Sequence, residues 1–272
     1  FTTSADTVCD GTAVTFTSTS TSNQSGVPQL IHQWNFGNGQ TSTDSLPAPV
    51  VFTNSGTQDS LYTVWLKVTN AFGCVDSVQK GILVRPNAKA EAQLVNGFDC
   101  APFKIDTSVV KAVHYPMANA VYTWKIFDKN FNLITTQTGQ HALNHTIVND
   151  GDTVYVRLVV SSLYGCKADS ITQLMYTILN PVASFTVPTS GCSPLQTQVA
   201  NTSSPGVSYQ WYLNGQLQST TAENPLFTLN NNSHTQDSTV QIKLVVTAGT
   251  GCKDSTTQTV TVYPRPLAQF SI

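Results

Sequence analysis

One pattern recurs three times along this chain of 272 residues: a cysteine, a tryptophan and then a second cysteine. In each copy the tryptophan precedes the second cysteine by about 40 residues, an interval too regular to arise by chance. The chain is therefore expected to fold as copies of one domain, although its length alone suggests about two domains. The cysteine pairs are Cys9 and Cys74, Cys100 and Cys166, and Cys192 and Cys252, with Trp34, Trp124 and Trp211 between them.

A proline-containing segment closes each copy and places the domain boundaries. We predict repeat 1 over residues 1–86, repeat 2 over residues 87–181 and repeat 3 over residues 182–266. Residues 267–272 include Ala-Gln-Phe, which matches the Ala-Ser-Phe at the start of repeat 3, so we expect a fourth repeat to begin there. On this interpretation the sequence is a window of a longer array.

Apolar and polar residues alternate within each copy, as in residues 62–68 and 240–246. A period of two indicates strands with one buried face, and Gly- and Asn-containing turns separate these strands. About 90 residues with seven or so short strands and a central tryptophan predict an immunoglobulin-like sandwich. The predicted fold class is all-β, with three tandem Ig-like antiparallel sandwiches in a linear array.

Charge is scarce, and this excludes two kinds of partner. The chain has 13 Lys and Arg against 15 Asp and Glu, and only 10% of its residues are charged. Without a basic stripe or a polybasic patch, nucleic-acid binding and electrostatic docking to a membrane are not expected. Roughly a quarter of the chain is Ser or Thr, yet 40% is hydrophobic, so we expect a folded protein rather than a disordered tract.

The residues around the first tryptophan form a distinctive motif: residues 34–39 read Trp-Asn-Phe-Gly-Asn-Gly, and Ser42, Pro49 and the segment that begins at Tyr62 follow. This motif resembles the signature of PKD (polycystic-kidney-disease-type) domains. The match decays around Trp124 and Trp211, so the later copies are assigned through the repeat alignment. Asn35 and Asn38 replace the acidic residues of the family pattern, which argues against a calcium site there because hard cations favour carboxylate oxygen.

The Gly-Cys before Asp-Ser, together with Gly-Cys-Ser-Pro at residues 191–194, further resembles PKD arrays in large surface proteins of Bacteroidota. This resemblance implies export by the type IX system, a place on the outer-membrane-associated cell surface, and a role in gliding or attachment. We expect a non-catalytic stiff spacer or shaft of an extracellular adhesin or filament. Its expected partners are neighbouring repeats and other surface proteins or polysaccharide. Two alternatives remain: a module that binds polysaccharide or protein, and accessory domains beside a secreted enzyme.

The six cysteines favour disulfides over a metal site, because no Cys-x-x-Cys spacing or histidine cluster accompanies them. The simple pairing joins the two cysteines within each copy. In a sandwich, however, the first cysteine of a copy lies in an early loop and the second in a late turn at the opposite end. A disulfide needs Cα atoms within about 7 Å, whereas a six-residue strand spans about 20 Å. We therefore favour inter-repeat bonds, Cys9 to Cys166 and Cys100 to Cys252, while intra-repeat pairs and free thiols stay open.

Aspartate is followed by Ser or Thr more often than composition explains. Nine of the 13 Asp residues have this neighbour, where about three would be expected by chance. The pattern is similar to the O-glycosylation sequon of Bacteroidota, although Asp-Ser turns capped by local hydrogen bonds are the simpler explanation. In eight of the nine pairs the next residue is apolar or Thr, and these eight give the predicted O-glycosylation sites: Thr7, Ser45, Ser60, Ser77, Thr153, Ser170, Ser238 and Ser255.

Catalysis finds little support in the sequence, so we predict no enzyme, no cofactor and no metal. The histidines share no position in the repeat, and neither a nucleophile elbow nor a phosphate loop is present. Trp34, Trp124 and Trp211 could stack on sugars if exposed, but at a central strand position they are expected in the domain cores. Trp65 has no counterpart in the other copies and is the better candidate for a surface contact.

Overall fold

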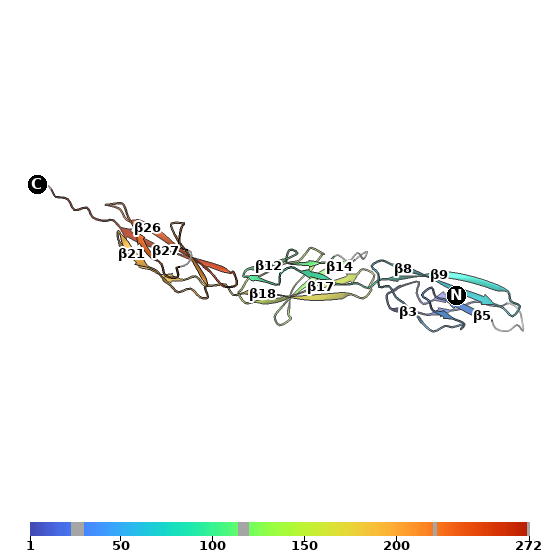
Figure 1. Ribbon diagram of the computed structural model, residues 1–272. Coiled ribbons are helices and arrows are strands. Elements are labelled where there is room, and N and C mark those ends of the chain that lie inside the picture. The colour runs from blue at the N-terminus through green and yellow to red at the C-terminus, as the bar shows by residue number, and fades with distance from the viewer. Residues whose placement is uncertain (23–29, 114–119, 220–221, 271–272) are drawn as a thin grey trace. The chain divides into compact units, whose positions relative to one another are not determined.

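The computed structural model describes residues 1–22, 30–113, 120–219 and 222–270. Throughout these ranges the chain forms strands, turns and loops and no helix (Figure 1). Within the same ranges, accordingly, no helix is long and apolar enough to cross a membrane. The predicted fold class, an all-β chain of tandem Ig-like sandwiches, is confirmed.

Among the described residues, the strands fall into three successive sets of nine. The first set is β1(Thr2–Thr3), β2(Thr7–Cys9), β3(Thr12–Val14), β4(Phe16–Thr17), β5(Ile31–Asn35), β6(Thr41–Ser42), β7(Val50–Phe52), β8(Ser60–Thr69) and β9(Val75–Arg85). The second is β10(Ala92–Leu94), β11(Phe98–Cys100), β12(Phe103–Asp106), β13(Val110–Ala112), β14(Ala120–Asp128), β15(Leu133–Thr138), β16(Asn144–Ile147), β17(Thr153–Ser162) and β18(Asp169–Ile178). The third is β19(Phe185–Thr186), β20(Ser190–Cys192), β21(Leu195–Gln198), β22(Ala200–Asn201), β23(Ser208–Leu213), β24(Gln216–Ser219), β25(Leu226–Leu229), β26(Ser238–Thr247) and β27(Lys253–Tyr263).

All three sets share one topology. A five-stranded sheet runs β2-β9-β8-β5-β6 in the first set, β11-β18-β17-β14-β15 in the second and β20-β27-β26-β23-β24 in the third. The other four strands of each set form two-stranded pairs, such as β1-β4 and β3-β7. The count exceeds the predicted seven because short strands change partners. Around Thr15, for example, the chain leaves its pairing with β7 and joins β1.

One edge strand of each five-stranded sheet is parallel to its neighbour, whereas hairpin-connected strands are antiparallel. β2 pairs in parallel with β9, β11 with β18 and β20 with β27. The early cysteine of each set is the last residue of this edge strand, so it lies beside the end of the set's last strand. That placement brings each early cysteine next to the linker that leaves its set.

The alternation read from the sequence places the cores. In β8, Val64 and Leu66 are buried and Trp65 between them is 46% exposed. The first core is rich in aromatic side chains: the rings of Trp34 and Phe36 stack with centroids 5.9 Å apart, and Phe16 packs against both. The third core places Trp211 among aliphatic side chains from β26 and β27, with Phe185 edge-on to its ring.

By spatial contact the chain forms two compact units. One comprises residues 1–97, 105–145 and 154–175, and the other residues 98–104, 146–153 and 176–272. The second strand set contributes to both units, so the repeat boundaries at residues 86 and 181 stay a prediction. Residues 267–270 lie outside any strand and residues 271–272 lie outside the described residues, so the start of a fourth repeat also stays a prediction.

Candidate functional site

Two disulfides link the early loop of one strand set to the late turn of the next. Cys9, at the end of β2, bonds to Cys166 in the turn between β17 and β18, with their Cα atoms 5.5 Å apart. Cys100, at the end of β11, bonds to Cys252 in the turn between β26 and β27, with Cα atoms 5.6 Å apart. These are the two inter-repeat pairs that the loop-placement argument favours. We call the surroundings of the first bond the first joint and those of the second bond the second joint.

Each joint has the same two halves because each strand set has the same topology. On one side, Cys9 lies opposite Arg85 in the register of β2 with β9, and Cys100 lies opposite Ile178 in that of β11 with β18. On the other side, a tight turn ends in a glycine at positive φ directly before the second cysteine, namely Gly165 (φ 75°) and Gly251 (φ 91°). Cys166 and Cys252 are only 5% and 1% exposed.

An aspartate at the start of the last strand of the second and third sets, directly after the late turn, holds the linker that enters its strand set. The backbone N–H of Ala90 donates to Oδ2 of Asp169 at 3.0 Å, and that of Ala183 donates to Oδ2 of Asp254 at 2.8 Å. Both alanines are only 8% exposed, so their N–H groups need an acceptor inside the protein. A carboxylate is a strong one, because hydrogen bonds to charged groups contribute more than neutral ones. We call this contact the aspartate clamp.

An asparagine binds the early loop in both joints. Nδ2 of Asn87 donates to the carbonyl of Asp10 at 3.3 Å, and Nδ2 of Asn180 donates to the carbonyl of Ala101 at 2.8 Å. Asp10 and Ala101 directly follow the early cysteines. The amide therefore ties the linker to the loop that carries the disulfide.

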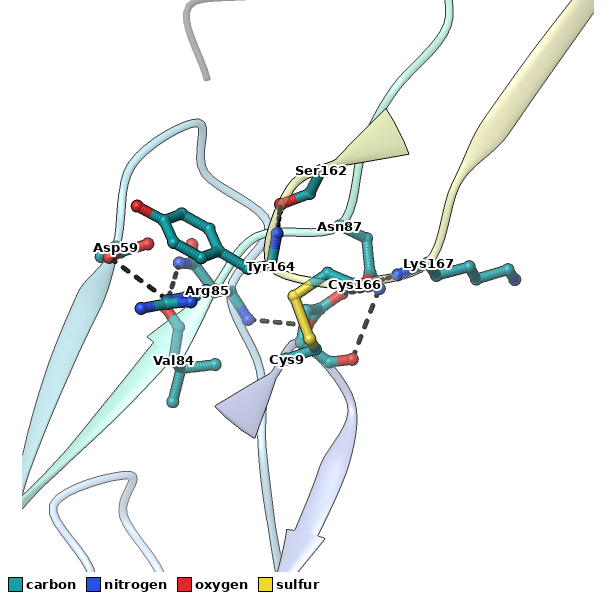
Figure 2. Close-up of a disulfide and its surroundings, with 11 residues drawn as sticks. Cys9, Asp59, Val84, Arg85, Asn87, Ser162, Tyr164, Cys166 and Lys167 are labelled. Atoms are coloured by element: carbon teal, nitrogen blue, oxygen red, sulfur yellow. Dashed lines mark hydrogen bonds and ion pairs between the residues drawn. A yellow bond between two sulfur atoms is a disulfide. The ribbon is translucent and has the colours of Figure 1, made fainter. Parts of the chain in front are cut away.

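The first joint contains further contacts, which Figure 2 shows around the disulfide. The N–H of Lys167 donates to Oδ1 of Asn87 at 3.2 Å, and the N–H of Ala88 donates to the carbonyl of Lys167 at 3.0 Å. The guanidinium carbon of Arg85 lies 3.4 Å from the centre of the Tyr164 ring, within the range of a cation–π contact. Nε of Arg85 also lies 3.9 Å from Oδ2 of Asp59. Arg85 therefore contacts both Tyr164 and Asp59 beside the disulfide.

The other two cysteines carry free thiols and are exposed. Cys74 lies in the turn between β8 and β9, the place that Cys166 and Cys252 occupy in their own sets. Cys192 ends β20 and lies opposite Tyr263, as Cys9 lies opposite Arg85. Each strand set thus contains both cysteine positions, and these two are the ones without a counterpart in the chain.

The three tryptophans lie in the cores rather than on a binding surface. Trp34 is 2% exposed, Trp124 1% and Trp211 0%. The indole N–H of each donates to a backbone carbonyl, that of Asp44, Gln140 or Ala222 respectively. A buried indole needs such a partner, so the repeated bond fixes each ring in its sheet.

The eight predicted O-glycosylation residues differ in how accessible they are. Five are exposed, namely Thr7, Ser45, Ser77, Ser170 and Ser255, whereas Ser60, Thr153 and Ser238 are partly buried. Oγ of Ser238 is enclosed and has no hydrogen-bond partner among the described residues. In the folded chain this hydroxyl therefore offers no attachment point for a sugar.

Several aspartates of the Asp-Ser/Thr pattern make structural contacts of their own. Asp169 and Asp254 form the clamps, and Asp6 pairs with Lys80 at 2.7 Å. The hydrogen bond from Lys80, followed by that from Thr3, holds the pKa of the Asp6 carboxyl below its ordinary value. Sequence reasoning missed the clamp, although one signal was present: an aspartate follows each second cysteine and an alanine follows each closing proline segment.

No metal or catalytic centre emerges from the described residues. No three His, Cys, Asp or Glu side chains among them gather in a way that could hold a metal ion. Burial lowers the pKa of His145, but this histidine has no acidic or nucleophilic partner in any contact described for it. The arrangement that recurs in the molecule is the joint.

The first strand set also has a counterpart among known families. Residues 2–85 match the PKD domain. This match covers β1 to β9, and the other two sets repeat the topology of that PKD domain. The chain thus consists of tandem Ig-like domains, the first of which is similar to PKD domains, and such domains are consistent with a non-catalytic structural or adhesive module.

The chain is also similar to solved tandem-domain structures. The three N-terminal domains of the highly immunogenic outer capsid protein of bacteriophage RB49 match at 13% identity over 98% of both chains, with a TM-score of 0.40. Chicken CNTN1 domains FN1–FN3 match at 11% identity, over 93% of this chain and 94% of that one, with a TM-score of 0.37. Fibronectin(III)-like modules of Clostridium thermocellum CbhA match at 12% identity, over 68% and 98%, with a TM-score of 0.33. A search of curated proteins found no match.

Proposed function

We propose that this chain is a stapled spacer: a non-catalytic, extracellular segment that carries load within a large surface adhesin or filament. The observation that carries the proposal is the recurrence of one joint. Both joints combine a disulfide, an aspartate clamp and an asparagine bond at equivalent positions. A protein whose repeats needed to move freely about their linkers would gain nothing from these three constraints.

The physical role of the staple follows from where it lies. Force along the chain enters and leaves each repeat through its linker, and the disulfide crosses the same joint beside that linker. Two covalent connections then share the tension. Interfaces between domains of one chain are otherwise small and polar, and relative motion is the default for them. A disulfide removes that freedom, and bonds that close long loops are the most stabilising on the chain-entropy model.

Disulfides and Ig-like domains fit an extracellular protein, since such bonds persist in oxidising compartments. Display on a bacterial outer surface after type IX export is the finer part of the proposal and rests on the sequence resemblance. Protease treatment of intact cells tests it. We expect the segment to be removed from wild-type cells, and to be absent from the surface of cells that lack the export system.

The stiffening role is tested by removing one staple. The double variant Cys9→Ser/Cys166→Ser opens the first joint, and Cys74→Ser/Cys192→Ser is the matched control because it removes two thiols and leaves both joints intact. We expect small-angle scattering to give a broader range of dimensions for the first variant alone. Trypsin should also cut after Lys89 in the linker about ten-fold faster, as followed on reducing gels. Equal behaviour of the two variants would refute the role.

O-glycosylation is a second part of the proposal, supported by the exposure of Thr7, Ser45, Ser77, Ser170 and Ser255. Sugars there would hydrate a surface that has few charges. Peptide mass spectrometry of material from the native source should find sugars on these hydroxyls and not on Ser238. Unmodified peptides at all five positions would refute O-glycosylation, and the structural contacts of the aspartates would then explain the Asp-Ser pattern.

A further inference from the structure

The five-stranded sheet of the second strand set has two cations side by side on the face that points away from the core. Lys125 of β14 lies directly opposite Arg157 of β17 in the register of these two neighbouring strands (Figure 1). The next residues along each strand, Trp124 and Leu158, are buried on the other face. Like charges directly opposite each other destabilise a sheet. The fold alone therefore does not explain this pair.

The carboxylates of the surrounding strands are engaged elsewhere. Strands β14, β15, β17 and β18 contain two acidic residues, Asp128 and Asp169. Asp169 forms the aspartate clamp of the first joint, and Asp128 accepts hydrogen bonds from the turn that follows it. In the described part of the chain, neither Lys125 nor Arg157 belongs to an ion pair. This face of the sheet is therefore positively charged, and an anionic partner complements it.

Aromatic rings lie beside the two cations on the same face. The guanidinium carbon of Arg157 lies 5.1 Å from the centre of the Phe127 ring, within the range of a cation–π contact. Tyr155 lies opposite Phe127, and its ring stacks on that of Phe131 with centroids 4.2 Å apart. Phe131 is 55% exposed, so the stack presents an open ring surface to solvent. We call these residues the cation–aromatic patch: Lys125, Phe127, Phe131, Tyr155 and Arg157.

The turn between β14 and β15 holds Phe131 in place. The N–H groups of Asn130 and Asn132 each donate to Oδ1 of Asp128 at 2.8 Å, and Nδ2 of Asn132 donates to Oδ2 at 2.9 Å. Phe131 itself has φ 61°, a left-handed conformation that is unfavourable for a bulky residue and favours glycine. The protein thus keeps a large exposed ring at a position where its backbone is strained, as is frequent at binding sites.

The equivalent positions of the other two sets lack this combination. Counted from the buried tryptophan and from the leucine opposite it, each of those sets has at most one cation and one aromatic residue there. The residues that align with Lys125, Phe127, Tyr155 and Arg157 are Asn35, Gly37, Thr63 and Trp65 in the first set, and Tyr212, Asn214, Gln241 and Lys243 in the third. The sandwich fold therefore does not require the patch.

From this arrangement we propose that the cation–aromatic patch binds an acidic polysaccharide whose sugar rings carry carboxylates. The apolar C–H face of one sugar packs on the open ring of Phe131, and a carboxylate farther along the polymer accepts hydrogen bonds from Arg157 and Lys125. The stacked rings and the cations lie at opposite ends of the patch, so a polymer of repeated units can contact both. An acidic peptide would pair with the cations but lacks a flat apolar face for the ring.

Binding of two polyuronates to the full chain, polygalacturonate and alginate, tests the proposal. Fully methyl-esterified polygalacturonate is the matched control, because it keeps the sugar backbone without its charge, and poly-L-glutamate supplies the charge without sugar. By affinity electrophoresis we expect at least one polyuronate to bind about ten-fold more tightly than either control, and added salt to weaken its binding. Failure of both polyuronates to bind refutes the proposal. Equally tight binding of either control also overturns it.

Charge variants locate the site on the molecule. Arg157→Gln and Lys125→Gln should each weaken polyuronate binding about three- to ten-fold, because each removes one of the two cations. Lys111→Gln is the matched control: Lys111 is an exposed lysine of the same strand set on β13, which belongs to a different sheet. This variant should bind as the wild type does. An equal loss in all three variants would assign binding to net charge and contradict a site at the patch.

Phe131→Gly separates the loss of the ring from a loss of the fold. Glycine adopts φ 61° without strain, so the turn should be retained while the ring is removed. We expect binding to weaken about three- to ten-fold with an unchanged circular dichroism spectrum. Phe72→Ala, which removes an exposed ring outside the patch, should have no effect. Full binding by Phe131→Gly would overturn the stacking of sugar on this ring. The stapled-spacer role is tested by cysteine variants and does not depend on these results.

Discussion

The two joints share a frame but differ in the contact beside it. Both have the disulfide, the aspartate clamp and the linker asparagine. The first adds Arg85 over Tyr164, whereas the second has Ile178 and Thr250 at those two positions, which cannot form a cation–π contact. The backbone-directed contacts are thus the constant part of the joint, and the pair beside the disulfide varies from joint to joint. Variable pairs of this kind can set which repeats fit together.

Removing the disulfides should cause the largest loss of stability, and the loss should differ between the two joints. We expect each double variant to lower the free energy of unfolding of the structure around its disulfide by about 2–4 kcal/mol. The two variants are Cys9→Ser/Cys166→Ser and Cys100→Ser/Cys252→Ser. We expect the larger loss at the second joint, because Arg85 and Tyr164 still hold the first. Pulse proteolysis across a urea series measures both losses. An equal or larger loss at the first joint contradicts this ranking.

Removing an aspartate clamp should cause the second-largest loss of stability, and this loss should be similar in both joints. Asp169→Ala and Asp254→Ala leave a buried N–H, that of Ala90 or Ala183, without its acceptor, which costs about 1–3 kcal/mol. Amide hydrogen exchange at these alanines should speed up by the matching factor. Asp237→Ala serves as the control, because Asp237 is an exposed aspartate of the same Asp-Ser type outside both joints. Protection of Ala90 that survives in Asp169→Ala would show that another group holds the linker.

Exchanging the variable pair tests whether it belongs to the first joint alone. Replacing Arg85 with Ile and Tyr164 with Thr copies the second joint into the first. We expect each change to cost about 0.5–2 kcal/mol, the range of a partly desolvated cation–π contact. A double-mutant cycle isolates the coupling between the two side chains. Purely additive losses would mean that Arg85 acts through Asp59 or through packing instead.

A surface ion pair outside the joints should matter least. The lowered pKa of Asp6 means that its stabilising effect is present above the ordinary aspartate value of about 4 and is lost as the pH falls through the lowered folded value. Lys80→Ala should raise the pKa of Asp6 toward its ordinary value, as followed by NMR titration of the carboxyl carbon. Stability at neutral pH should change little, since exposed pairs contribute little. An unchanged pKa would assign the shift to Thr3.

Periodicity and repeats sufficed to predict much of this molecule. Alternation places Val64 and Leu66 inside and Trp65 outside, and the interval between Trp and Cys aligns the three sets. Loop placement in a sandwich favours the Cys9–Cys166 and Cys100–Cys252 disulfides that the structure has, but from the sequence alone it leaves intra-repeat pairs and free thiols open. The aspartate clamp and the stacking of Arg85 on Tyr164 depend on strand register and linker path, which bring together residues about 80 apart in sequence. A local pattern contains no such information, so the same aspartates suggest glycosylation when they are considered alone.

The parallel pairing of β2 and β11 beside the linkers has a consequence for the integrity of the polymer. The Cys9–Cys166 bond closes one covalent ring and the Cys100–Cys252 bond closes a second, and the two rings overlap between residues 100 and 166. Together they span residues 9–252. A single cut in the backbone anywhere in that span leaves its fragments joined through a disulfide. A filament built in this way withstands one proteolytic event at any position between its outermost staples and separates only after a second cut or a reductant.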